Sequence, residues 1–552
     1  MGFLLLAATS DGSYGTIVSY FPEAALDMSF SFLRMLAAYA LSLAFSLAYG
    51  YYAATHRTGE RVMIPVLDIL QSVPILGFFP FAVIVLAAAT PGSWVGPNLA
   101  SVFLIFTSMA WNMVFGVYES LKTLPGDLRE ASDTFGLRGW LLFRRVLYPA
   151  TVTRLVYNSV LSWTAGWFFL VEAEIFTTNT SESLAGIGSY LSFAASESNA
   201  PKFLAGIIVL VIVIAFMDFA VWRPLGQWAE RFRYDQTPSG ESEAVAPAPD
   251  ASGRFRRARV YVTERVRTGV SRITTPFVQL AAITVRPSRP SSARRKSAVY
   301  YASLGTILVL VWLLLIAIVV AVIVVFTSPI EPSVRAMIAT VPEAAAASTL
   351  RVVVAYGFCL AISLPLALWI ARSSRGARVG LPIIEVVASF PATALFPVII
   401  FQLIPYLTPE GASIVMLMTG MIWYLFFNIL AGARSLPPDL TEAARAYGVR
   451  KMQYFRRVVL PGIFAALVTG SITAFGGGWN TLIVAEYLQV GQVVALSLLG
   501  LGQLIDIGYA LGSAGYPLMA TALFAMVGVV VAINELIWKP LYRRAATKYR
   551  YD

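Results

Sequence analysis

The sequence offers few side chains for covalent, redox or metal chemistry. Its 552 residues include one cysteine, Cys359, and one histidine, His56. A thiolate or imidazole metal site needs several such ligands. No Gly-x₄-Gly-Lys-(Ser/Thr) motif occurs, so the chain lacks the loop that holds nucleotide phosphates. We therefore expect no catalytic residue, no metal and no cofactor here, and any nucleotide hydrolysis would belong to another subunit.

The polar residues with matched spacing lie in two segments, 124–149 and 436–461, each between long apolar runs. The two segments share an acidic residue near the start, a Glu-Ala pair, an aromatic residue and a glycine, all at one constant separation along the chain. The matched residues are Asp127, Glu130, Ala131, Phe135 and Gly136 in the first segment, and Asp439, Glu442, Ala443, Tyr447 and Gly448 in the second.

Each segment predicts a short helix with both ends marked. Asp127 or Asp439 is a candidate N-cap, and the Glu three residues later would complete a variant of the capping box. The glycine suits a left-handed stop at the C-terminal end. Pro149 and Pro461 suit the first turn of the helix that follows. Apolar residues at i, i+3 and i+7 give one face that could dock into a groove of a partner.

The pattern Glu-Ala-(Ala/Ser)-x₃-Gly, followed by Pro thirteen residues after the Gly, resembles the coupling loop of type I ABC importer permeases. The resemblance covers most of the chain except the N-terminus and a middle linker. Ser132 departs from it, because the motif usually has a second Ala there. The resemblance implies partners: two ATP-binding cassette ATPase subunits and an extracytoplasmic solute-binding protein. It assigns ATPase coupling to the matched residues, although Glu130 and Glu442 could serve helix capping alone.

Composition predicts an all-α, polytopic membrane protein. Mean hydropathy is +0.71, and charged residues make up 13%, where a soluble chain has about twice that fraction. Apolar runs predict about eleven transmembrane helices, arranged as two parallel pseudo-two-fold repeats. Lys and Arg in alternate loops predict that the N-terminus lies outside and the C-terminus in the cytoplasm, and the resemblance implies the cell (inner) membrane.

The predicted boundaries follow from these runs. They are an N-terminal extracytoplasmic segment (1–23), a first permease half (24–223), a basic cytoplasmic linker (224–297), an additional transmembrane helix (298–328), a second half (329–541) and a cytoplasmic tail (542–552). The additional helix lets both halves enter the membrane from the same face. The arginines and valines of the linker, between 254 and 272, predict contact with anionic lipid. No nucleic-acid module accompanies this charge, so we expect no nucleic-acid partner.

Other matched residues are candidates for the transport pathway or its gate, namely Ser72, Pro74, Trp167 and Glu174 in the first half, and Ser389, Pro391, Trp479 and Glu486 in the second. The prolines should break an apolar span and free carbonyls toward the interior. Each glutamate lies near the outer end of a span, where it would line the pore or, alternatively, extend to the outer interface. Arg34 and Arg351 could attract an anion, but their position favours an interfacial anchor.

The Ser-x-Pro-x₅-Pro pattern and the later Ala-Glu pair resemble the nitrate/sulfonate/taurine/bicarbonate branch, which implies a small anion as solute. Permeases of that branch usually carry one half per chain, so the fusion departs from it. Fused permeases for thiamine and ferric iron keep those solutes open. An ion-coupled secondary transporter would need buried ionisable residues near mid-membrane, and few candidates exist. A membrane enzyme would need a cluster of nucleophile, base and metal ligands, and none can be assembled.

Overall fold

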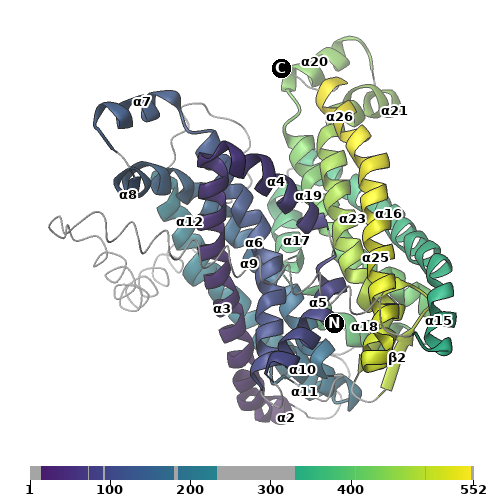
Figure 1. Cartoon of the computed structure of the whole chain (residues 1–552). Helices are drawn as coiled ribbons and strands as arrows, with labels where there is room; N and C mark the ends of the chain where they lie inside the picture. Colours follow the sequence, from purple (N-terminus) through teal and green to yellow (C-terminus); the bar gives the residue numbers. More distant parts are fainter. Residues whose placement is uncertain are drawn as a thin grey trace. The chain divides into compact units, whose positions relative to one another are not determined.

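The structure is a computed structural model of the 552-residue chain, shown in Figure 1. It describes residues 14–72, 74–90, 94–137, 139–178, 184–232, 330–373, 375–388, 390–404, 406–449, 451–490 and 493–548. These residues are overwhelmingly helical, which confirms the all-α prediction. One small exception is an antiparallel hairpin of β1 (Tyr487–Val490) and β2 (Val493–Ser497). The predicted linker and additional helix lie almost wholly outside the described residues.

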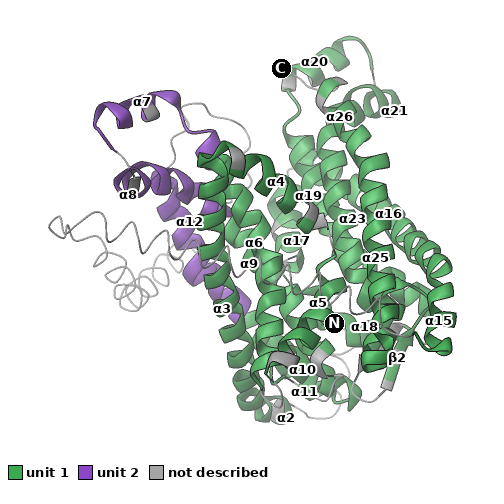
Figure 2. Cartoon of the chain, in the orientation of Figure 1, with its two compact units in different colours: residues 1–119, 158–212, 324–552 green, residues 120–157, 213–323 purple. Residues whose placement is uncertain are grey.

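The chain divides into two compact units, coloured separately in Figure 2. Unit 1 comprises Met1–Glu119, Asn158–Ile212 and Val324–Asp552, and unit 2 comprises Ser120–Tyr157 and Val213–Ile323. In unit 2 the described residues form short helices: α7 (Gly126–Thr134), α8 (Gly139–Leu142), η1 (Phe143–Leu147), η2 (Asp218–Trp222), α12 (Arg223–Ala229) and η3 (Glu230–Phe232). The helix therefore continues to Phe232, beyond residue 224 where the linker was predicted to begin.

The first repeat contributes helices that run mostly or wholly in unit 1. They are α2 (Tyr14–Ser19), α3 (Phe21–Thr55), α4 (Arg57–Ser72), α5 (Ile75–Ala89), α6 (Val95–Lys122), α9 (Tyr148–Thr178), α10 (Ile187–Ser196) and α11 (Ala200–Met217).

The second repeat lies entirely in unit 1. Its first part comprises α15 (Pro332–Ala339), α16 (Val341–Arg372), η5 (Gly376–Gly380), α17 (Leu381–Ala388), η6 (Ala392–Leu395), α18 (Phe396–Leu403) and α19 (Pro409–Arg434). Its second part comprises α20 (Pro438–Ala446), α21 (Lys451–Tyr454), η7 (Phe455–Val459), α22 (Leu460–Gly462), α23 (Phe464–Glu486), α24 (Leu501–Ala510), η8 (Gly512–Gly515), α25 (Tyr516–Ile533), η9 (Asn534–Trp538) and α26 (Lys539–Lys548). The predicted tail is thus largely helical.

Six helical segments among the described residues are long and apolar enough to cross a membrane, or seven if the bent pair Lys451–Gly462 and Phe464–Glu486 counts as one span. Three further predicted spans coincide with α9 and with the interrupted pairs α4–α5 and α17–α18. The span predicted at 299–327 lies outside the described residues, so the total of eleven stays a prediction.

Prolines interrupt the second span of each repeat, as predicted. In the first repeat, α4 ends before Pro74 and α5 begins directly after it. In the second, Pro391 is the N-cap of η6, and Pro397 lies in the first turn of α18. Proline lacks the N–H that would continue the helical ladder, so each break is dictated locally.

Small and hydroxyl side chains bring the long helices together. Ser46 on α3 donates a hydrogen bond to the Ala110 carbonyl oxygen on α6, at 3.2 Å. The equivalent Ser363 on α16 donates to the Ile422 carbonyl oxygen on α19, also at 3.2 Å. Interhelical bonds of this kind are typical of membrane bundles, where hydrophobic burial discriminates weakly between neighbouring helices. The two repeats are therefore assembled by the same contacts.

Candidate functional site

The first candidate coupling segment, α7, begins two residues earlier than the capping prediction requires. Its N-cap is Pro125, and no side chain makes a capping hydrogen bond. The predicted N-cap role of Asp127 is therefore wrong, and so is that of Asp439, because α20 already begins at Pro438. Both aspartates lie in the first turn instead, where the helix dipole favours a negative charge.

The C-terminal ends follow the prediction. Gly136 has φ +64° and Gly448 has φ +68°. Behind Gly136, the Leu137 N–H donates to the Ser132 carbonyl oxygen at 2.9 Å. Behind Gly448, the Val449 N–H donates to the Ala444 carbonyl oxygen at 2.8 Å. These six-residue closures are Schellman motifs, which require a residue that tolerates positive φ.

The residues assigned to ATPase coupling are accessible. Glu130, Ala131, Glu442 and Ala443 are exposed, as are both aspartates. Phe135 is 80% exposed and Tyr447 is 86% exposed. The small residues at one equivalent position, Ser132 in α7 and Ala444 in α20, are buried.

Large exposed aromatic side chains at matched positions of two short helices indicate surfaces made for a partner.

Pro149 and Pro461 each follow a π-helical turn, η1 and η7, which carries the paired arginines. The chain is already helical before each proline, and α9 begins at Tyr148 and α22 at Leu460, so each proline lies in the first turn of the following helix, as predicted. The wider π turn accommodates the missing N–H without ending the helix.

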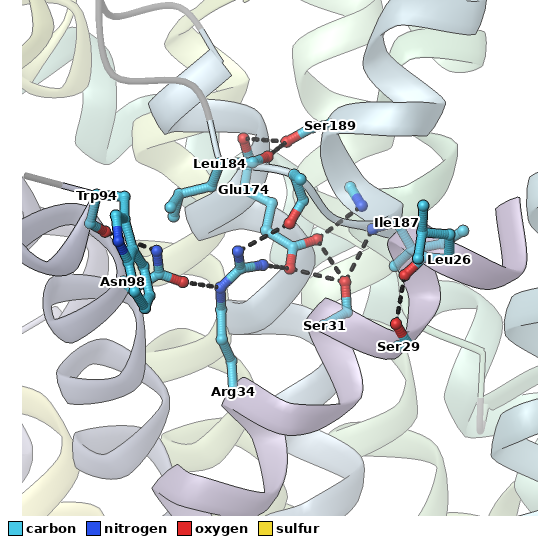
Figure 3. Close-up of polar contacts among 12 residues, drawn as sticks. Leu26, Ser29, Ser31, Arg34, Trp94, Asn98, Glu174, Leu184, Ile187 and Ser189 are labelled. Atoms are coloured by element: carbon cyan, nitrogen blue, oxygen red, sulfur yellow. Dashed lines mark hydrogen bonds and ion pairs between the residues drawn. The ribbon is translucent and has the colours of Figure 1, made fainter. Parts of the chain in front are cut away.

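A buried ion pair joins α3 to α9 in the first repeat, as Figure 3 shows. The Arg34 guanidinium on α3 donates to the Glu174 carboxylate on α9 at 2.6 Å, and the Ser31 hydroxyl donates to the same carboxylate at 2.7 Å. The Gly188 N–H, in the first turn of α10, donates to it at 2.8 Å. Arg34 also donates to the Asn98 side-chain oxygen at 2.7 Å.

The second repeat builds the same arrangement from the equivalent residues. The Glu486 carboxylate accepts hydrogen bonds from Ser348 at 2.6 Å, from Arg351 at 2.7 Å and from the Gly502 N–H at 2.8 Å. One position differs chemically. Where the first repeat has Asn98, the second has Glu410, which accepts two further bonds from Arg351 at 2.6 and 2.7 Å.

We name these two arrangements the outer clasps, after the side of the membrane on which the sequence predicts them. Each joins the first long helix of its repeat to the helix after the coupling segment and to a short helix whose N-terminus faces the carboxylate, where the helix dipole favours the negative charge. Glu174 and Glu486 are 0% exposed, so the alternative that they extend to the interface is wrong. Arg34 and Arg351 are buried ion-pair partners, not interfacial anchors.

Sequence reasoning did not assign the remaining clasp residues, although a signal was present. A serine precedes the arginine by three residues in both repeats, at Ser31 and Ser348. A Gly-x-Gly pair follows each glutamate, at 186–188 and 500–502. A Cβ at Gly500 would lie 2.1 Å from the Glu486 carboxyl carbon, so the close approach requires glycine.

The broken spans lie where the two repeats meet within unit 1. The Ile75 N–H, beside Pro74, donates to the Asn480 side-chain oxygen on α23 at 2.6 Å. A second hydrogen bond runs from the second repeat to the first: the Thr393 hydroxyl, close to Pro391, donates to the Phe168 carbonyl oxygen on α9 at 3.2 Å.

The neighbouring pathway candidates Trp167 and Trp479 are almost fully buried, and so are Pro74 and Pro391. The side chain of Ser72 and the residue Ser389 lie outside the described part of the chain. The described residues contain no group of three or more His, Cys, Asp or Glu side chains arranged to hold a metal ion.

The repeated architecture and the two candidate coupling segments have a counterpart among known families. The profile of the family "Binding-protein-dependent transport system inner membrane component" matches residues 24–222 and 363–537, one stretch in each repeat. The chain belongs to this family. It is a multi-pass membrane protein with two such stretches in one polypeptide.

Individual relatives are about a quarter identical to the chain over the stretches that align. The glycine betaine/proline betaine transport system permease protein ProW of Escherichia coli is 28% identical over 168 residues, 30% of this chain and 46% of the relative. The nitrate import permease protein NrtB of Leptolyngbya laminosa is 27% identical over 192 residues, 35% of this chain and 64% of the relative. The taurine transport system permease protein TauC of E. coli is 23% identical over 208 residues, 38% of this chain and 71% of the relative. The chain thus spans less than two thirds of the first two relatives.

Proposed function

We propose that the chain forms both transmembrane halves of an ATP-binding cassette importer, with α7 and α20 as its coupling helices. Two partner ATPase subunits would each receive one coupling helix, and an extracytoplasmic binding protein would deliver the solute. The observation that carries the proposal is the pair of exposed helices, each stopped by a glycine at positive φ and each presenting an aromatic side chain. Membership of the family supports it.

ATP-driven closure of the ATPases would act on the two coupling helices and open the pathway outward. The contacts of Ile75 with Asn480 and of Thr393 with Phe168 join the repeats, so they must rearrange if the repeats separate. The outer clasps stay inside their own repeats and would move with them as rigid parts. In this arrangement the N-terminus lies outside and the C-terminus in the cytoplasm.

The solute we propose is a small anion of the nitrate, sulfonate, taurine or bicarbonate kind. The printed names of NrtB and TauC, and of the aliphatic sulfonates permease SsuC, support that class. ProW favours a zwitterionic betaine as a second candidate. Thiamine and ferric iron remain alternatives from the fused architecture, and an ion-coupled secondary transporter is a rival of another kind.

Substitution of the two stop glycines tests the coupling role. No atom lies within 4 Å of a Cβ added at Gly136 or Gly448, so Gly→Val there meets no steric clash with the rest of the protein. The left-handed backbone alone costs about 1–2 kcal/mol for a side-chain-bearing residue, and more for a β-branched one. We expect Gly136→Val and Gly448→Val to leave the protein inserted and folded but to misdirect α7 and α20.

The assay is reconstitution with the cognate ATPase, measuring ATPase association and solute-stimulated hydrolysis. Gly126→Val and Ala446→Val are matched controls, because they add the same surface bulk to α7 and α20 without requiring positive φ. Wild-type transport rates in the double glycine variant would contradict the coupling role. Transport by the wild-type protein without any ATPase would contradict the importer itself.

A further inference from the structure

Glu172 on α9 is a buried carboxyl group that faces the second repeat. Phe168, Glu172 and Phe176 are spaced four residues apart, so they share one face of the helix. The Phe168 ring packs edge-on against Phe396 at a centroid distance of 6.3 Å. The Phe176 ring lies 5.2 Å from that of Tyr509 on α24. Glu172 therefore lies between two contacts that both reach the second repeat.

Asp506 on α24 faces Glu172 from the other side. It precedes Tyr509 by three residues, so the two side chains lie on the same face of α24, the face that meets Phe176. Burial, reinforced by the nearby carboxyls of Glu172 and Glu486, raises the pKa of Asp506 well above its ordinary value. Glu172 and Asp506 thus lie on the faces of α9 and α24 that meet at the contact of Phe176 with Tyr509.

One oxygen atom of each buried carboxyl group lacks a hydrogen-bond partner. Glu172 is 4% exposed and Asp506 is 6% exposed. The Oε2 atom of Glu172 and the Oδ1 atom of Asp506 have no hydrogen-bond partner among the described residues. No Lys or Arg of those residues forms an ion pair with either. Glu486, in contrast, is neutralised by Arg351.

The pair breaks the symmetry of the repeats. The position equivalent to Glu172 is Val484, and the position that corresponds to Asp506, by the Gly-x-Gly pairs, is Ser192. Each outer clasp forms in a repeat that lacks one of the two acids, so neither acid is needed for that arrangement. Buried, unpaired carboxyl groups are costly to fold, and ionisable residues at this depth mark substrate pathways. No structural role explains why these two carboxyl groups are buried at this cost, whereas the binding of a ligand between them would explain it.

We propose that Glu172 and Asp506 form a subsite for the positively charged nitrogen of the transported solute. Two carboxyl groups supply the charge, and the flanking rings of Phe176 and Tyr509 offer the aromatic surface that organic ammonium groups prefer. The described residues include no group of three or more ligands arranged for a metal ion, which favours an organic cation. This inference rests on the proposed importer function and narrows it to solutes that carry an ammonium group, alone or beside an anionic one.

The test uses the full chain in nanodiscs and two matched pairs of probes. Taurine is compared with ethanesulfonate, which lacks the amine. Glycine betaine is compared with 3,3-dimethylbutanoate, in which carbon replaces the quaternary nitrogen. We expect binding to favour the nitrogen-bearing member of at least one pair by about tenfold or more, as for a buried charge pair. Glu172→Gln and Asp506→Asn should abolish that preference.

Glu535→Gln is the matched control, because Glu535 is 52% exposed and lies far along the sequence from the pair. The apparent melting temperature of each variant without ligand checks folding, and neutralising the buried pair should leave it unchanged or raise it. Equal binding within both probe pairs, or a preference that survives in the double variant, would overturn the inference. ATPase association is measured on the same samples. If the ATPase binds but the ammonium preference is absent, the inference fails alone; if no ATPase binds, the proposed function fails.

Discussion

The chemical difference between the outer clasps predicts unequal costs for the same substitution. Glu174→Gln leaves the Arg34 guanidinium, 7% exposed, without a carboxylate at ion-pair distance among the described residues. Its remaining acceptors, the Asn98 side chain and the Ala185 carbonyl, are neutral. Removing one partner of a buried ion pair costs about 3–5 kcal/mol because the other charge stays buried. We expect Glu174→Gln to lose stability in that range.

Glu486→Gln should cost less, because Arg351 keeps both of its hydrogen bonds to the Glu410 carboxylate. The loss of stability in Glu486→Gln then comes only from weakened hydrogen bonds at a buried site, which cost about 1–3 kcal/mol. The expected difference between the two variants is about 2 kcal/mol. Since Glu410 is 52% exposed, solvent screening weakens its ion pair with Arg351. The test therefore depends on the order of the two stability losses more than on the size of their difference.

The assay is thermal unfolding of each variant in nanodiscs at one scan rate, because large membrane proteins unfold irreversibly and apparent midpoints depend on rate. A double-mutant cycle adds Glu410→Gln, alone and with Glu486→Gln. The apparent melting temperature of the variant that combines Glu410→Gln with Glu486→Gln should fall as far as that of Glu174→Gln, because Arg351 then lacks both carboxylates. Equal losses for the two single variants, or a larger loss for Glu486→Gln, would refute the reasoning.

Three further predictions concern other parts of the chain. A cysteine at position 252 should react with an impermeant label from the cytoplasmic side and one at position 93 from the outside; labelling of both from one side would contradict the eleven-span topology. Replacing the four arginines between 254 and 259 by glutamine should weaken binding of a linker peptide to anionic vesicles, since each basic residue near such a surface contributes about 1 kcal/mol; unchanged binding would exclude the lipid contact. Ser198 has φ +52°, so Ser198→Gly should stabilise the protein by up to about 1 kcal/mol, whereas the helical control Ser196→Gly should destabilise it in the same melting assay.

Features that depend on neighbours in the sequence were predictable. Proline cannot continue a helix, so Pro74 and Pro391 predicted the interruptions of the second span in each repeat. Gly136 and Gly448 predicted the left-handed helix ends, because few other residues adopt that conformation cheaply. The prediction failed at the opposite end of the same helices. An aspartate can cap a helix or lie in its first turn, and the preceding prolines decided between the two.

Features that depend on which helices meet were decided by the tertiary structure. Glu174 is the same residue whether it lines a pore, reaches the interface or pairs with Arg34, and 140 residues separate the two partners. Only the packing of α3 against α9 and α10 brings guanidinium, carboxylate and helix N-terminus together. The same holds for Glu172 and Asp506, which belong to different repeats and are brought to one region because the face of α9 that carries Phe176 meets the face of α24 that carries Tyr509. Local sequence sets backbone preferences over a few residues, while the partner of a buried charge is chosen by contacts between distant segments.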